Sequence, residues 1–269
     1  MDVKLVALDI DGTIIPPNTP PERAYPSPRL KAAVRALRER GVVVVVASGR
    51  MFPGTAEIAR HLGLDTPVIC QQGCSIHLLD GTMLHEFAID GRAARELVEY
   101  AREIDRVYEW FNPLRYIVSR RCPEAEEYGR VSGIVPEYRP DPERSGVRPT
   151  GVGIISTHEE ASGIHRHLAG LHGEALHVLD FPSVTVAVAP EANKGHALSL
   201  LCAGLDIDRS RVLAVGDSVN DAPMLAWAGR GVALAHSDRY ARDAADEVLA
   251  ENGDTDPVAT LLEGLLRAR

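Results

Sequence analysis

Two carboxylates stand at the end of the first apolar segment of the chain, where residues 8–15 read LDIDGTII. The preceding KLVAL is short and β-prone, so it predicts a buried strand that ends at Asp9 and Asp11. Period-2 alternation places both side chains on one side of an extended backbone, and Gly12 allows a sharp turn. Because two close carboxylates repel unless a cation or a shared proton relieves them, the pattern favours a functional pair over a solvated turn.

A hydroxyl and a glycine follow the five valines at residues 42–46. A β-branched run of this kind is typical of a strand buried on both faces, and it ends in Ser48, Gly49 and Arg50. A hydroxyl together with backbone N–H groups at the start of a helix can bind an anion. An anion site and a simple helix N-cap by Ser48 both explain the pattern.

Oxygen-bearing side chains gather after another strand-like segment, in RVLAVGDSVNDAPML at residues 211–225. Asp217, Asn220 and Asp221 lie within five residues, and Pro223 suits the first turn of a following helix. Hard oxygen ligands at a strand end are typical of Mg²⁺ sites. Helix capping would explain one of these residues but not all three.

One lysine has a position that suggests chemistry. Lys194 opens a predicted helix in PEANKGHAL, after a strand and before the Asp217–Asp221 cluster. Most lysines are solvated surface charges, but a cation at this place could neutralise crowded carboxylates and hold a phosphate.

Strand and helix signals alternate in the first and last parts of the chain, which predicts a parallel sheet with helices on both faces. We therefore predict a Rossmann-like α/β core formed by residues 1–81 and 187–269. Since open α/β folds bind ligands at the carboxyl ends of their strands, the polar residues above are expected to converge there. The predicted strands are 3–9, 42–47, 67–71, 211–216 and 231–234, and the predicted helices are 28–40, 53–62, 194–204 and 220–228, followed by two short helices.

The segment between these parts, residues 82–186, has a different pattern. Strand-like stretches such as RYIVS, GVGIIS and SVTVAVA mix with predicted helices at 91–105 and 159–169 and with a loop rich in proline and charge. The pattern predicts an α+β domain inserted into the α/β core.

Composition limits the classes of partner. The formal net charge of −9 argues against a nucleic-acid or membrane-surface binder, because such proteins present a basic field. No apolar run is long enough to span a bilayer, and Asp9 comes before any signal-peptide core could form, so we expect a cytoplasmic protein that acts on a small molecule. The four cysteines have no zinc spacing and are expected to be reduced and mostly buried. The pattern does not indicate an oligomeric state.

Taken in order, these stretches resemble the four motifs of the haloacid dehalogenase-like (HAD) hydrolase superfamily, and the insertion looks like the α+β cap of its Cof-type sugar-phosphatase branch. The resemblance covers essentially the whole chain. The matching stretches are Asp9-x-Asp11-Gly12-Thr13, Ser48-Gly49-Arg50, Lys194-Gly195 and Gly216-Asp217-x-x-Asn220-Asp221.

The resemblance implies a Mg²⁺-dependent phosphatase that acts on a small phosphorylated metabolite, with a sugar phosphate as the expected substrate. It makes Asp9 the nucleophile that forms an aspartyl-phosphate and Asp11 the general acid/base. The remaining implied roles are phosphate binding by Ser48, Gly49, Lys194 and Asn220, and Mg²⁺ binding by Asp9, Asp11 (through its backbone carbonyl), Asp217 and Asp221.

Two departures from the branch and two rival functions accompany this prediction. Gln72-Gly73-Cys74 stands where the branch usually has Asn-Gly-Ala, and the proline-rich loop 16–28 is longer than usual. A sugar phosphomutase or phosphotransferase, and a phospho-accepting signalling module, would use similar residues.

Substrate specificity is expected to lie in cap residues that face the site. Glu109, Asn112 and Arg115 are polar candidates, and the favoured interpretation of all three is as exposed loop residues.

Overall fold

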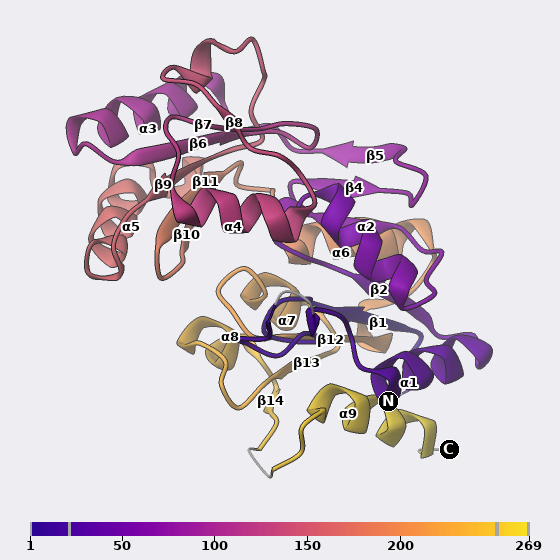
Figure 1. Cartoon of the computed structure of the whole chain (residues 1–269). Helices are drawn as coiled ribbons and strands as arrows, with labels where there is room; N and C mark the ends of the chain where they lie inside the picture. The colour runs from indigo at the N-terminus through magenta and orange to yellow at the C-terminus, as the bar shows by residue number, and fades with distance from the viewer. Residues whose placement is uncertain (1, 21–22, 251–252, 268–269) are drawn as a thin grey trace.

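The structure, a computed structural model, describes residues 2–20, 23–250 and 253–267 (Figure 1). A parallel five-stranded sheet in the order β14-β13-β12-β1-β2 forms the centre of one domain, which confirms the predicted Rossmann-like α/β core. Its strands are β1 (Leu5–Leu8), β2 (Val43–Val46), β12 (Val212–Gly216), β13 (Arg230–Ala233) and β14 (Glu247–Val248).

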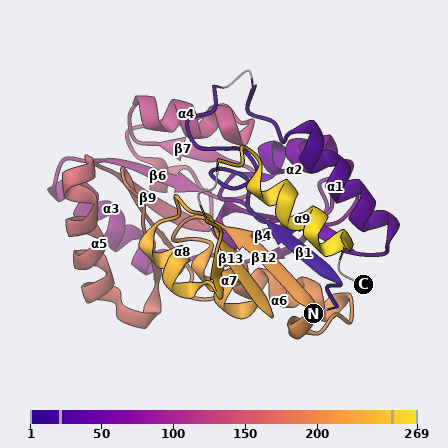
Figure 2. The ribbon, with the colours of Figure 1, turned by 90° about the horizontal axis from the view of Figure 1, so that it is seen from below.

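Helices cover both faces of this sheet (Figure 2). Side chains alternate between the two layers along β2, because Val44 and Val46 pack in one apolar cluster and Val45 packs in the other. The five-valine segment is therefore buried on both faces, as predicted. The first layer contains α1 (Pro28–Glu39), α2 (Phe52–His61) and α9 (Pro257–Arg267), and the second contains α6 (Lys194–Gly204), α7 (Ala222–Trp227) and α8 (Arg239–Ala244).

Local sequence signals determine where the helices near the site begin. The Ser27 hydroxyl accepts the N–H of Leu30 at 2.9 Å and Pro28 opens α1, as the sequence predicts. Asn193 caps α6 in the same way by accepting the N–H of His196 at 2.8 Å. In the proline-rich loop 16–28, residues 21–22 lie outside the described residues.

A second domain is built on a six-stranded sheet in the order β10-β11-β9-β6-β7-β8, in which all neighbours are antiparallel except β7 and β8. Helices α3 (Gly91–Glu103) and α5 (His158–His172) pack on one face, and α4 (Pro123–Ser132) lies on the face toward the core (Figure 1). This domain is the predicted α+β cap. Its strands are β6 (Val107–Phe111), β7 (Tyr116–Val118), β8 (Glu137–Tyr138), β9 (Gly151–Ile155), β10 (His177–Asp180) and β11 (Val184–Val188).

The strands of a small antiparallel sheet follow β2 of the core sheet and precede β6 of the cap sheet along the chain. This sheet contains β3 (Val68–Cys70), β4 (Ser75–His77) and β5 (Met83–Glu86), and a bridge from Ile69 to Ala47 joins it to the core. Since β5 belongs to this sheet and β11 reaches Val188, we propose that the cap begins after β5 and ends with β11. Short 3-10 turns occupy Gln71–Gly73, Pro142–Arg144, Gly173–Ala175 and Arg209–Arg211.

Helix α4 joins the cap to the core. The Tyr128 hydroxyl donates to the carbonyl of Gly49 at 3.0 Å, and the Ser132 hydroxyl accepts the N–H of Met51 at 3.1 Å. Gly54 of α2 packs so closely on the carbonyl of Val131 that a Cβ atom would collide with it. The cap is therefore seated directly on the start of α2. Across the described residues, none of the helices combines the length and apolar composition that crossing a bilayer requires.

Candidate active site

The two aspartates of the first motif lie at the carboxyl end of β1 in different surroundings. Asp9 is buried, with 4% of its surface exposed, whereas half of the Asp11 side chain is exposed. Gly12 turns the chain with a φ of +87°, and a Cβ there would collide with the Asp217 carboxylate. Only glycine therefore fits at position 12, where the first motif packs against Asp217 of the fourth motif.

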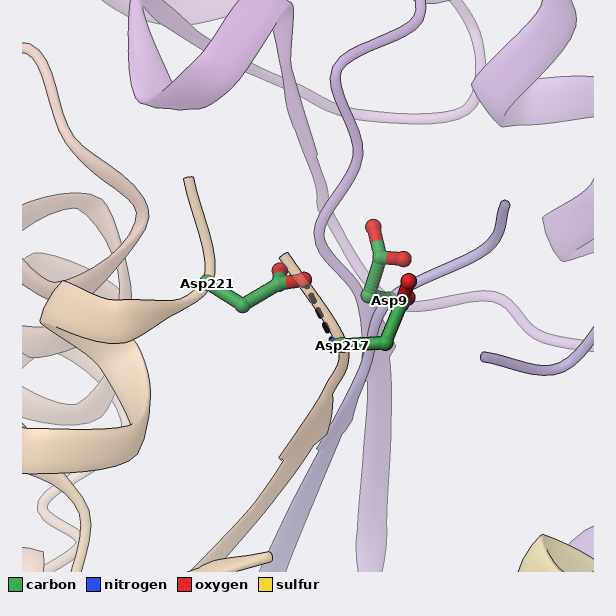
Figure 3. Close-up of side chains that lie close together, drawn as sticks. All are labelled: Asp9, Asp217 and Asp221. Atoms are coloured by element: carbon green, nitrogen blue, oxygen red, sulfur yellow. Dashed lines mark hydrogen bonds between the residues drawn. The ribbon is translucent and has the colours of Figure 1, made fainter. Parts of the chain in front are cut away.

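Three carboxylates converge above the sheet edge (Figure 3). One oxygen from each of Asp9, Asp217 and Asp221 lies within 4.8 Å of the others. Thr13 donates a hydrogen bond to Asp217 Oδ1 at 2.7 Å, and Asp221 Oδ2 accepts the backbone N–H groups of Asp217 and Ser218 at 2.9 and 3.0 Å. The loop after β12 thus holds its own two carboxylates beside the one that ends β1.

Lys194 lies in the same cluster and is fully buried. Its Nζ donates to Asp9 Oδ1 and to Asp221 Oδ1, each at 2.6 Å. Gly195 supports this position, since a Cβ atom there would collide with the carbonyl of Pro223 at the start of α7. The lysine that the sequence singled out therefore links the nucleophile candidate to the Asp217–Asp221 loop.

Burial shapes the electrostatics of this cluster. Loss of water, together with the charge of Asp221, raises the pKa of Asp9 above its usual value despite the attraction of Lys194. Burial and Asp221 also raise the pKa of Asp217 to about 6. Burial alone would lower the pKa of Lys194, but the carboxylates of Asp221 and Asp9 raise it above its usual value. One ammonium thus faces three carboxylates, an arrangement that a divalent cation would stabilise.

Ser48 and Gly49 follow β2 on the same edge. Ser48 is fully buried, and its hydroxyl accepts the N–H of Arg50 at 3.1 Å. The N-cap of α2 is Met51, so Ser48 does not cap that helix. The N–H of Gly49 donates to no other described residue, which leaves a backbone donor beside the carboxylates.

Arg50 has a role that the sequence did not predict. Its Nε and Nη2 donate to the two oxygens of Asp11 at 2.7 and 2.5 Å, and only 7% of its side chain is exposed. A bidentate pair of this kind fixes the orientation of the carboxylate. The spacing Ser-Gly-Arg after the valine strand was the available signal.

The amide of Asn220 meets the unusual Gln72. Asn220 Nδ2 donates to Gln72 Oε1, while Ser218 donates to Asn220 Oδ1 at 2.7 Å. Gln71 and Gln72 both adopt left-handed backbone conformations, with φ of 50° and 64°. This strained turn brings the Gln72 amide to the site, so an amide contact is present despite the departure from Asn-Gly-Ala.

A cavity of about 660 Å³ lies between the core and the cap, and part of this group of residues lines it. The core contributes Asp9, Asp11 and Asn220, among others, while α4 and the cap sheet form the opposite wall. Glu109 lies in that wall. Its interpretation as an exposed loop residue is wrong, because it is a buried residue in the middle of β6.

The other two cap candidates do not line this cavity. Asn112 and Arg115 form the turn after β6, where Asn112 Oδ1 accepts the N–H of Arg115 at 2.9 Å. Arg115 pairs with Glu137 at 2.6 Å, and both are partly exposed.

Two further side-chain types have clear positions. All four cysteines are free thiols, and three are buried, as expected. Burial raises the pKa of Cys70 to about 12 and that of Cys202 to about 11, so neither is a reactive thiolate at neutral pH.

His236 was not predicted from the sequence, and its Nε2 lies 2.7 Å from the carbonyl of Gly12.

Comparison with known proteins gives a consistent result over almost the full length. A family model described as haloacid dehalogenase-like hydrolase matches residues 6–262. The chain is 31% identical over 266 residues to a phosphoglycolate phosphatase of Methanopyrus kandleri, and the match covers 97% of each chain.

Two solved structures share the fold. A putative HAD/COF-like hydrolase from Plasmodium vivax has a TM-score of 0.85 at 20% identity, over 100% of this chain and 97% of that one. A HAD subclass IIB sugar phosphatase has a TM-score of 0.80 at 18% identity, over 98% of this chain and 100% of the other. Both match the core and the cap together.

Proposed function

The chain belongs to the haloacid dehalogenase-like hydrolases, in their Cof-type branch, and from this premise we propose that it is a Mg²⁺-dependent phosphatase of a small sugar phosphate. The observation that carries the proposal is the position of Asp9, a buried carboxylate at the floor of a cavity, beside two further carboxylates and a buried lysine. A sugar phosphate suits the cavity volume, and one structural neighbour is a sugar phosphatase.

In the proposed reaction an Asp9 oxygen attacks phosphorus, and the bond from phosphorus to the leaving oxygen breaks. Asp11 enters the reaction as the carboxylic acid, which requires one of its two hydrogen bonds from Arg50 to open. It donates its proton to that oxygen and then accepts one from the water that attacks the phosphoaspartate. The second attack breaks the bond between phosphorus and Asp9, releases phosphate and restores both aspartates. The two neighbouring carboxylates thus act as nucleophile and proton carrier.

The donor set fits Mg²⁺, because three hard carboxylates lie close together and one of them, Asp9, lines the cavity. We assign the ion to Asp9, Asp217, Asp221 and the backbone carbonyl of Asp11. When bound, Mg²⁺ neutralises charge on the phosphoryl oxygens.

Phosphate would be held by groups of the core. We assign this role to the Ser48 hydroxyl, the free N–H of Gly49, the ammonium of Lys194 and the amide of Asn220. Each lies at the carboxyl edge of the parallel sheet. Phosphoryl transfer depends mainly on positioning and charge neutralisation, which these groups provide.

The proposal is tested by phosphate release from a panel of phosphorylated metabolites and an aryl phosphate. EDTA should abolish release and added Mg²⁺ should restore it, with Asp9→Asn as the inactive control. Full activity in metal-free buffer would contradict the assignment of Mg²⁺. Transfer to a sugar hydroxyl instead of water would conserve the phosphate ester and release no free phosphate.

A further inference from the structure

The cap sheet contributes a buried acidic side chain to the cavity wall that faces the catalytic groups. Glu109 lies at the centre of β6, and only 7% of its surface is exposed. Its neighbours Tyr108 and Trp110 pack on the far side of the sheet, under α3 and α5, whereas Glu109 and Phe111 line the cavity. The carboxyl group therefore faces the space between the cap and Asp9.

Two glycines on the adjacent strand make room for these side chains. Gly153 pairs with Glu109 and Gly151 pairs with Phe111 across β6 and β9. A Cβ atom on Gly153 would collide with Glu109 Oε2, and one on Gly151 would collide with the Phe111 ring. The Gly-Val-Gly of β9 thus lets a carboxylate and an aromatic ring lie flat across the sheet.

Only one oxygen of Glu109 has a partner. The Tyr116 hydroxyl donates to Oε1, and within the described part of the chain no group donates to Oε2. Burial raises the pKa of Glu109 to about 7 against the opposing effect of Tyr116. Oε2 is open to the cavity, so a ligand that displaces water from this oxygen must supply a donor in its place.

The charges around Glu109 restrict which ligand can do so. Glu124 and Glu127 of α4 line the same cavity. Arg130 donates to both oxygens of Glu127. Among the described residues, Glu109 and Glu124 are therefore the two cap carboxylates of this wall without a cationic partner. Of the described residues that line the cavity, only Arg50 is a lysine or arginine, and both Asp11 oxygens already bind it.

We propose that Glu109 selects leaving groups that offer it a hydroxyl or ammonium donor and excludes leaving groups that carry an anionic group. The proposal rests on the proposed phosphatase function and names the substrate class for that site. Phosphate binds at the core end, and the rest of the substrate extends along Phe111 until a donor reaches Glu109 Oε2. A carboxylate placed there would face like charge without a neutralising cation.

The proposal separates this chain from the phosphoglycolate phosphatase that it resembles. Glycolate, the leaving group in that relative's name, is a carboxylate. We therefore expect phosphoglycolate to be a poor substrate here, although the two chains share 31% identity.

Three six-carbon sugar and sugar-acid phosphates of similar size test the proposal, because they differ in the charge of the leaving group. Glucosamine 6-phosphate offers an ammonium, glucose 6-phosphate offers only hydroxyls, and 6-phosphogluconate carries a carboxylate. We expect kcat/KM, measured at a pH well above 7 where Glu109 is ionised, to be at least about tenfold lower for 6-phosphogluconate than for the other two, since a like-charge contact costs more than the 1.4 kcal/mol that corresponds to tenfold.

The variant Glu109→Gln removes the charge and keeps an oxygen for Tyr116. It should reduce the discrimination against 6-phosphogluconate by about tenfold. The matched control is Glu137→Gln, which removes a carboxylate from β8 of the same sheet, outside the cavity, and should leave the ratio unchanged.

The outcomes separate this inference from the function on which it rests. Release of no phosphate from any substrate, including the aryl phosphate, would contradict the phosphatase function. If the aryl phosphate is hydrolysed and 6-phosphogluconate is hydrolysed as well as or better than the other two six-carbon phosphates, the inference alone is overturned. The inference is also overturned if the aryl phosphate is hydrolysed and none of the three six-carbon phosphates is. The ratio of kcat/KM between 6-phosphogluconate and the other two substrates in the wild-type protein tests the inference even if Glu109→Gln does not fold. If Glu109→Gln folds and this ratio is unchanged, the inference is also overturned.

Discussion

Asp9 and Asp11 are separated by one residue but have different partners, Lys194 and Arg50. We predict that Asp9→Asn forms no phosphoenzyme, because it lacks the attacking oxygen. Asp11→Asn should retain attack by Asp9 on an activated aryl phosphate and lose about 10²- to 10⁴-fold in turnover, the usual contribution of a general acid/base. Hydroxylamine trapping or mass spectrometry should find phosphate on Asp9 in this variant.

Phosphate trapped on another residue, or any labelling of Asp9→Asn, would show that the roles are assigned wrongly. Wild-type protein incubated under the same conditions is the reference, since its phosphoenzyme should turn over.

The sequence identified site residues only where a residue type was unusual among its neighbours in the chain. Paired aspartates, a clustered Asp-Asn-Asp and a lysine at a helix start stand out in a sequence, and all lie together in the structure. Glu109 did not stand out, because the burial of the glutamate in VYEWF becomes evident only once this segment is known to be a buried strand. Gln72 reaches the site through a left-handed backbone that residue type does not predict.

At the scale of the element, alternating strand and helix signals sufficed for the core. Helix α6 begins and ends where the sequence predicts, and the boundaries of the other predicted core strands and helices with stated ranges differ by at most two residues. The prediction named no element at α4 or at six strands, which are β4, β5, β6, β8, β10 and β14. These strands are only two to five residues long, and α4 contains Gly129 and a polar composition that suits a loop as well as a helix.

The contact between α2 and α4 permits a prediction about the cap. In Gly54→Ala the new methyl group collides with the carbonyl of Val131, so α4 must shift away from the core. We expect kcat/KM for sugar phosphates to fall about tenfold or more, because displacement of about 1 Å commonly costs more than that, while a small aryl phosphate is affected less.

Gly163→Ala in α5 is the matched control, because nothing lies within 4 Å of its added Cβ. It should leave both activities unchanged and stabilise the protein by up to about 1 kcal/mol through helix propensity. Equal losses for both substrates in Gly54→Ala would mean that the contact does not act through the cap.

At the scale of the whole molecule, the buried acidic cluster links stability to pH and to Mg²⁺. The pKa of Asp217 is raised from 3.8 to about 6 in the metal-free fold, so the folded state keeps this proton to a higher pH than the unfolded chain. The contribution of Asp217 to stability therefore declines as pH rises from about 4 to about 6. Since Mg²⁺ requires ionised ligands, the rise in Tm that it causes should be larger at pH 7 than at pH 5.

Thermal unfolding with and without Mg²⁺ measures this effect. At a hundredfold excess over its dissociation constant, Mg²⁺ should stabilise the fold by about 2.7 kcal/mol. Asp217→Asn should lose most of this gain, whereas an equal gain at both pH values would contradict the coupling.

The pairing of β1 with β12, in which Leu5 lies opposite Val212, also has a consequence for synthesis. Every strand of the cap sheet lies between these two residues in the chain, so the whole cap emerges from the ribosome while β1 still lacks its central neighbour. The cap is thus free to fold first, and the core must close a loop of about two hundred residues afterwards, a slow step of high contact order. Asp9 is translated before the cap, whereas Lys194 and Asp217 follow the cap and can reach Asp9 only after it has emerged.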